Sequence, residues 1–147
     1  MEGFFNFISM EKILRYTLGK EERLKSRKEI EQLFKEGKSF SIFPFRIIYQ
    51  FTTPSSAGSR LQAGFTVSTK HFKKATERNR IRRLIKEAYR LQKNELKQAQ
   101  FASVDKLAIF FIYVAKELLP YLIVSEKMTA ALHRLIQLSR KPKKQLF

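Results

Sequence analysis

The segment that runs from Lys70 to Arg90 reads KHFKKATERNRIRRLIKEAYR and combines a helical apolar stripe with dense positive charge. Nine of its 21 residues are Lys or Arg, and only Glu77 and Glu87 oppose them. From about Glu77 onward, the apolar residues recur with the spacing of one buried helix face: Ile81, Leu84, Ile85, Ala88 and Tyr89. The pattern predicts a helix that packs on a core through one face and exposes cations on the other.

The other face of this predicted helix carries a row of cations. With about 100° between successive residues, the side chains that point away from the stripe are Asn79, Arg82, Arg83, Lys86 and Arg90, with Arg80 on one flank and Arg78 at the start. Lys73 and Lys74 lie just before the helix, where positive charge opposes the helix dipole and a bound phosphate would reverse that penalty.

This row differs from an ordinary solvated helix face. Such faces mix Glu with Lys or Arg, because these pairs stabilise a helix by about 0.2–0.5 kcal/mol each. Between Arg78 and Lys86 that mixing is absent. A polyanion lying along the row would relieve the repulsion between like charges and release its own counterions. The row therefore predicts an interface for nucleic-acid phosphate.

The composition of the whole chain agrees with this prediction. Lys and Arg number 30 against 13 acidic residues, which gives a formal net charge of +17 over 147 residues. A hydrophobic content of 44% with 14 Phe is enough for a folded core, so the charge is carried by a folded domain. The chain has no cysteine, which excludes disulfides and thiolate zinc sites and fits a reducing cytoplasm. No stretch reaches the roughly 18 apolar residues of a membrane helix.

Two further helices are predicted from their end signals. Ser26 and Glu29 fit a capping box at the start of a helix of about ten residues, and Gly37 supplies a left-handed stop after it. Ser125 can cap a last helix, whose inward stripe consists of Met128, Ala131, Leu132, Leu135 and Ile136.

Strands are predicted on both sides of the basic helix. Residues 43–51 alternate, with Pro44 suggesting an edge position or a break into two short strands, and residues 61–67 alternate again as the partner strand of a hairpin. Residues 107–115 are nearly all apolar and fit a strand buried on both faces, which makes the basic helix a crossover. The order predicts one α+β sandwich of helices against a small sheet over residues 21–139, between a variable leader, 1–20, and a basic tail, 140–147.

Two longer segments resemble a known family. Gly64–Lys70, GFTVSTK, and Glu77–Arg90, ERNRIRRLIKEAYR, resemble the strand and RNR helix of the bacterial ribonuclease P protein component. Arg23-Leu24 and the string FKEGKS at 34–39 resemble that family's N-terminal segment, so the resemblance runs from about Lys20 to Ile136. It implies an α-β-β-β-α-β-α fold in which the RNR helix makes a left-handed crossover, against the usual handedness.

The resemblance also implies a function. The protein would be a subunit of ribonuclease P, a cytoplasmic ribonucleoprotein endoribonuclease that removes the 5′ leader from precursor tRNA. The partner RNA would be the catalyst, with magnesium bound mainly by the RNA, and the protein would act by binding, inactive alone and needing no protein partner. The expected contacts with the catalytic RNA are Lys70, Lys73, Lys74, Arg78, Asn79, Arg80, Arg82, Arg83, Lys86 and Arg90.

A second expected site is a cleft between the first helix and the sheet, which would take the single-stranded leader. Phe34 matches one aromatic position of that cleft, and Tyr49 and Ser68 are proposed beside it. The family's other aromatic positions correspond here to Ile30 and Ile48, with Tyr49 one residue away. Stacking of a base on an aromatic side chain is worth about 1–3 kcal/mol.

The residues suggest no catalytic or metal site on the protein itself. Asp105 is the only aspartate, the other carboxylates are scattered among Lys and Arg in no pattern that suggests acid–base catalysis, and His71 and His133 lie 62 positions apart. Two other classes of protein remain open on composition alone. A structural RNA-binding protein, such as a ribosomal protein, would explain charge and size but not the RNR string. A DNA-binding module would need the basic helix in a major groove, which is awkward for a helix between two core strands.

Overall fold

The computed structural model describes residues 18–52, 60–101 and 106–140. The predicted leader falls almost wholly outside these residues, as does the tail beyond residue 140. The elements follow the predicted order α-β-β-β-α-β-α, preceded by one short 3-10 helix: η1 (Lys20–Glu22), α2 (Arg27–Glu36), β1 (Lys38–Ile42), β2 (Phe45–Thr52), β3 (Leu61–Val67), α3 (Ala75–Phe101), β4 (Lys106–Tyr113) and α4 (Tyr121–Arg140).

The four strands form one sheet in the order β1-β2-β4-β3. β1 and β2 are antiparallel neighbours, and β4 lies between β2 and β3, antiparallel to the first and parallel to the second. The predicted hairpin of 43–51 with 61–67 is therefore wrong. Alternation identifies strands but not their neighbours, and here the long apolar strand β4 separates the two. Pro44 lies in the turn between β1 and β2, so the predicted run 43–51 contains only β2, and β1 precedes it in residues where alternation predicted no strand.

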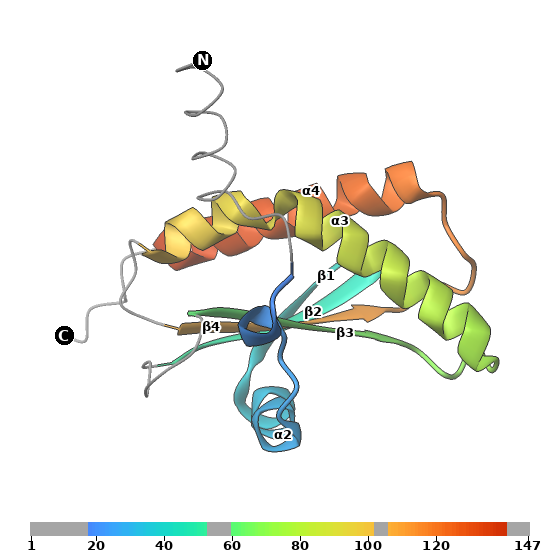
Figure 1. The fold of residues 1–147 in the computed structure, drawn as a ribbon, viewed down its shortest axis with the longest axis horizontal. Helices are drawn as coiled ribbons and strands as arrows, with labels where there is room; N and C mark the ends of the chain where they lie inside the picture. The colour runs from blue at the N-terminus through green and yellow to red at the C-terminus, as the bar shows by residue number, and fades with distance from the viewer. Residues whose placement is uncertain (1–17, 53–59, 102–105, 141–147) are drawn as a thin grey trace, which may run out of the picture.

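Helices cover both faces of the sheet. Figure 1 shows α2 on one side and α3 with α4 on the other. α3 connects the parallel neighbours β3 and β4 and is therefore the predicted crossover helix. The left-handed path that the resemblance implies for it stays a prediction.

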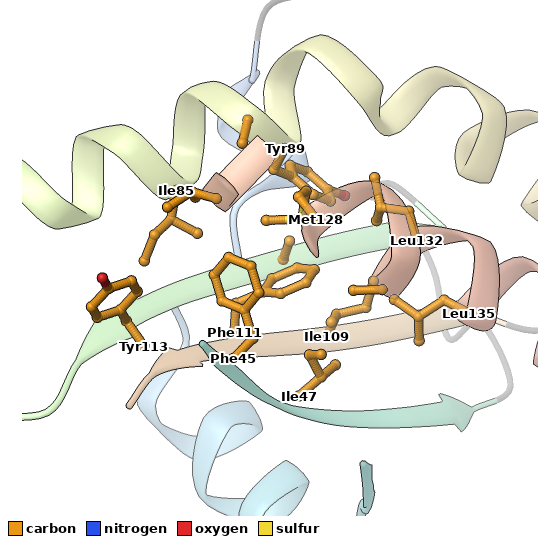
Figure 2. Packing of buried hydrophobic residues seen from close by; sticks show 14 of the residues in the cluster. Phe45, Ile47, Ile85, Tyr89, Ile109, Phe111, Tyr113, Met128, Leu132 and Leu135 are labelled. Carbon is orange, nitrogen blue, oxygen red and sulfur yellow. The ribbon is translucent and has the colours of Figure 1, made fainter. Parts of the chain in front are cut away.

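The main core lies between the sheet and the pair α3 and α4 (Figure 2). Alternate residues of β2 and β4 point into it, among them Ile47, Ile109 and Phe111. α3 contributes its predicted stripe, in which Ile85 is fully buried and Tyr89 is 1% exposed. The opposite face of the sheet holds a smaller cluster under α2: Leu24, Leu33, Ile48 and Phe110. Alternation thus sends neighbouring residues of one strand into different layers.

One predicted detail of the helix ends is confirmed, and two need correction. The Ser26 hydroxyl accepts a hydrogen bond from the Glu29 N–H as predicted, but Gly37 is extended, with φ −72°, and not left-handed. Glycine is needed there for space, since a Cβ would lie 2.4 Å from the Leu33 carbonyl oxygen. Ser125 lies inside α4, which begins after Pro120, and its hydroxyl accepts from the Gln92 side chain instead.

The basic helix is also longer than its apolar stripe predicted. α3 continues through residues 91–101, beyond the predicted apolar stripe that ends at Tyr89. Lys93 and Leu96 on this extension are nevertheless buried, at 1% and 0% exposure. A helical pattern based on apolar residues alone does not register a buried lysine. The apolar period is therefore interrupted at Lys93, although the buried face of the helix continues.

Candidate nucleic-acid interface

The cationic row lies on α3 as predicted. Ile81 and Ile85 anchor the inner face of the helix, at 1% and 0% exposure. On the outer side, the structure places the expected residues in two groups along the helix and the loop before it. Lys70, Lys73, Lys74, Asn79, Arg80 and Arg83 are exposed, whereas Arg78, Arg82, Lys86 and Arg90 are half-buried. All ten predicted contact residues therefore retain surface on this part of the molecule.

Arg78 holds the loop that precedes the helix. Its Nη1 donates to the carbonyl oxygens of Phe72 at 2.8 Å and Lys73 at 2.7 Å. Phe72 is buried and its ring lies 6.2 Å from that of Tyr113 in the core. The loop is thus held by the Arg78 hydrogen bonds and by the buried Phe72 ring. Its lysine side chains therefore extend from a fixed backbone.

Neighbours on α3 orient two further cations. Arg82 donates to the Asn79 side-chain oxygen at 2.8 Å, and Arg90 pairs with Glu87 at 2.6 Å. Hydrogen bonding to the Glu87 carboxylate raises the pKa of Arg90. Arg80 and Arg83 form no ion pair with an acidic side chain among the described residues. These two guanidinium groups are therefore the most available to an external anion.

The structure adds two cations that the pattern of the basic helix does not include. Residues 23–24 run alongside the edge strand β3, where Arg23 bridges to Ala63 and the Leu24 N–H donates to the Ala63 carbonyl at 2.9 Å. Burial lowers the pKa of Lys86, and the nearby charges of Arg23, Arg82 and Lys25 lower it further. Arg23 and Lys25 are thus near enough to the middle of the α3 row for their charges to act on Lys86. Arg23 belongs to the matched N-terminal segment, but its distance from α3 is a tertiary fact.

A groove follows the flank of α2. It is lined by Lys25, Arg27, Ile30, Glu31, Phe34 and Lys35. The Phe34 side chain is 50% exposed, and its ring meets Phe110 edge-to-face with centroids 5.1 Å apart. A ring supported at one edge and open on a face is suited to stack on a base. Lys25 connects this groove to the α3 row.

The predicted leader cleft needs one correction. Tyr49 is 8% exposed and packs against Phe40 and Phe51 in the core under α3 and α4. Phe34 lies on the other side of the sheet, so the structure does not bring the two rings together. Successive strand residues face opposite ways, and it is Ile48 that points towards α2. Ser68 follows β3 directly and is half-buried, and alternation from buried Val67 places it on the α2 side.

The part of the chain that the structure describes also bears on metal binding and on membrane insertion. There, no three His, Asp or Glu side chains come together in a way that could hold a metal ion. No helix among them is both long and apolar enough to cross a membrane.

Known proteins resemble this chain in both its sequence and its fold. The profile of the Ribonuclease P family matches residues 18–136. The chain belongs to the ribonuclease P protein family. The ribonuclease P protein component of Porphyromonas gingivalis is 35% identical over 125 residues, covering 82% of this chain and 87% of its own. That of Desulfovibrio desulfuricans is 35% identical over 115 residues, covering 74% and 85%.

Solved structures of ribonuclease P proteins share the fold. The protein from Thermotoga maritima has 27% identity and a TM-score of 0.57, over 77% of this chain and 96% of that one. The protein from Staphylococcus aureus has 18% identity and a TM-score of 0.57, and it supports the fold alone. As a member of the family, the chain is an RNA-binding subunit of ribonuclease P, the ribonucleoprotein endoribonuclease of tRNA 5′ processing. This confirms the resemblance and decides against the two other classes.

Proposed function

We propose that this ribonuclease P protein binds the catalytic RNA through the α3 row and the 5′ leader of precursor tRNA through the α2 groove. The single observation that carries the proposal is the division of α3 into two faces. One face is sealed in the core by Ile81 and Ile85, and the other presents Arg80 and Arg83 without acidic partners among the described residues. A helix held in this way offers a rigid line of charge to an RNA backbone.

The groove beside α2 supports the second half of the proposal. Exposed Phe34 offers a stacking surface, while Lys25 and Lys35 also line the groove and offer charges to phosphate. Aliphatic Ile30 and Ile48 stand where the family has aromatic residues, so Phe34 carries the stacking in this chain. Binding both RNAs through one domain would increase the affinity of the complex for substrates that still carry a leader.

In this proposal the RNA, and not the protein, catalyses cleavage of the precursor tRNA. Magnesium would be held mainly by the catalytic RNA, as the family resemblance implies. The protein's charge would offset repulsion between two polyanions and so reduce the magnesium that assembly requires. We place the complex in the cytoplasm, where precursor tRNA is made in bacteria, and assign no further protein partner to it.

The test is cleavage of a labelled precursor tRNA by a bacterial ribonuclease P RNA at a magnesium concentration where the RNA alone is nearly inactive. Adding the protein should restore accurate removal of the leader. The protein without RNA serves as the control and should not cleave. Binding without restored cleavage by the cognate RNA would reduce the protein to a general RNA-binding module and overturn the proposal.

A further inference from the structure

Glu22 forms a buried ionic cluster that ties the N-terminal segment to α3. Its Oε2 accepts from the Lys93 ammonium and, at 3.0 Å, from the Gly19 N–H. Its Oε1 accepts from the Lys97 ammonium at 2.6 Å. The Lys93 side chain is 1% exposed, and the Glu22 side chain 11%. One carboxylate thus joins η1 to the second half of the crossover helix.

Stability alone is a poor reason for such a cluster. Removing charges from water costs free energy that the attraction between them only partly returns, and apolar side chains of similar volume often serve as well. Burial by itself raises the pKa of Glu22, yet the two ammonium groups outweigh it and the pKa is lowered. The carboxylate therefore stays charged, and the cluster is a directional link between two particular elements.

What the link positions is the segment that follows it directly. Leu24 is 5% exposed in the cluster under α2, and its N–H donates to Ala63 on β3. Arg23 and Lys25, on either side of Leu24, are exposed. The Arg23 guanidinium also donates to the Leu18 carbonyl through Nε and Nη2, each at 3.3 Å, which restrains it at the surface.

The bonds from Glu22 to α3 and from Leu24 to β3 place two cations of the N-terminal segment near two cations of α3. Arg23 and Lys25 come from the N-terminal segment, and Arg82 and Lys86 come from α3. Their like charges repel, and the described residues place no carboxylate in contact with Arg23, Lys25 or Lys86. A phosphate between the two segments would turn that repulsion into attraction.

We propose that Glu22 is a positioning residue, and that the four cations it helps to assemble form a phosphate site at the junction between the α3 row and the α2 groove. The site comprises Arg23, Lys25, Arg82 and Lys86. The inference rests on the proposed function, because its ligand is a backbone phosphate of the RNA that this protein binds. It adds a second structural element to an interface otherwise made by the RNR helix and its loop.

The first test removes the N-terminal pair of cations. Arg23→Ala/Lys25→Ala should bind the ribonuclease P RNA more weakly, and the dependence of log affinity on log salt should fall by about 0.7–0.9 for each phosphate that the variant can no longer neutralise. The matched control is Lys28→Ala/Lys116→Ala, which removes the same charge from two exposed positions outside the site. An unchanged slope, or an equal decrease in the control, would overturn the site.

The second test separates positioning from simple electrostatics. Glu22→Gln removes one of 13 acidic residues and so raises the formal net charge of +17 by one. Nonspecific attraction predicts tighter RNA binding, whereas positioning predicts weaker binding with the reduced salt slope of Arg23→Ala/Lys25→Ala. Combining the three substitutions should weaken binding no further than the pair does, because the segment is already released. Equal or tighter binding by Glu22→Gln would overturn the assignment.

A charge-neutral variant distinguishes loss of the Glu22 link from general misfolding. Glu22→Gln/Lys93→Met removes one charge of each sign and leaves no buried ammonium facing an amide. Hydrogen exchange of the Leu24 amide should become fast in it while amides of β4 stay protected, and RNA affinity should fall. If Leu24 stays protected, Glu22 does not hold the segment. If Leu24 is released but affinity is unchanged, the segment does not contribute to binding. Either result rejects the proposal.

The same variants identify which RNA supplies the phosphate. Weaker binding of the catalytic RNA alone assigns it to that RNA, whereas weaker binding confined to precursor tRNA on the assembled complex assigns it to the leader. Failure of the wild-type protein to bind ribonuclease P RNA would instead reject the proposed function. Normal wild-type binding with no effect of Arg23→Ala/Lys25→Ala would reject this inference alone.

Discussion

Individual side chains on α3 differ in how free they are to bind RNA. Arg90 is paired with Glu87 and Arg78 is engaged by loop carbonyls, whereas Arg80 and Arg83 are exposed. Arg80→Ala or Arg83→Ala should therefore weaken assembly with the catalytic RNA and lower the salt slope by about 0.7–0.9 per phosphate released. Filter binding over a salt series measures both, with Lys116→Ala as the control. Wild-type affinity and slope in both variants would place these arginines outside the interface.

Phe34 is the aromatic side chain that the groove leaves open, although Phe110 supports its edge. Phe34→Ala should weaken binding of precursor tRNA by roughly tenfold, since a stacked base is worth about 1–3 kcal/mol. Binding of mature tRNA by the same complex should be unchanged. Phe43, 62% exposed at the turn between β1 and β2, provides a comparison. A larger precursor-specific decrease in Phe43→Ala would move the aromatic contact to that turn.

Gly64 shows how tightly the sheet is packed beneath the groove. A Cβ at this position would lie 2.4 Å from Phe110 Cε1, closer than any normal contact. Gly64→Ala should lower the free energy of unfolding by about 1–3 kcal/mol as the Phe110 ring is displaced. Gly19→Ala is the control, because its nearest neighbour would be Glu22 Oε2 at 3.9 Å. Urea unfolding compares the two, and equal stability would mean that Phe110 moves without cost.

Among the elements, η1 depends most on a titratable group. Burial raises the pKa of Glu22 but the bonds from Lys93 and Lys97 outweigh it, so the pKa lies below its ordinary value of 4.5. The unfolded chain therefore binds this proton more readily than the folded protein does. The stabilisation of the folded protein by the Glu22 carboxylate is complete above pH 4.5. It is lost as the pH falls through the lower pKa of the folded state.

Urea unfolding at neutral pH and in steps below pH 4.5 measures this effect. The wild-type protein should lose more free energy of unfolding on acidification than Glu22→Gln does, because the variant has no carboxyl to titrate there. Glu87→Gln is the control, since the pair of Glu87 with Arg90 lies at the surface, where water screens the attraction between the two charges. Identical acid dependence in wild type and Glu22→Gln would show that the cluster adds nothing to stability.

At the scale of the whole molecule, the net charge of +17 sets a cost for folding in dilute buffer. Self-repulsion destabilises the compact state, and anions that bind the folded form preferentially stabilise it by mass action. The melting temperature should therefore rise with added sulfate or with a short RNA, and more steeply than in Arg23→Ala/Lys25→Ala. Thermal unfolding followed by circular dichroism tests this. A melting temperature independent of anions would show that repulsion is not limiting.

The sequence by itself determined the kinds of element and the chemistry of the interface. Helical spacing identified the buried face of α3, alternation identified β2 and β3, and a continuous apolar run identified β4. The RNR string with its surrounding charges identified an RNA-binding surface. These signals are local, because the periods of helix and strand are properties of a few successive residues. The same reasoning found the Ser26 cap, whose hydroxyl reaches an N–H three residues away.

Only the tertiary structure decided which elements are neighbours. β4 enters between β2 and β3, which removed the predicted hairpin, and the sheet separates Tyr49 from Phe34. Glu22 meets Lys93 and Lys97 across more than 70 residues of chain, and Arg23 and Lys25 reach the α3 row in the same way. Such contacts depend on how layers stack, and no local period records them. The sequence therefore identified the cationic surface of α3, and the fold added residues of the N-terminal segment to it.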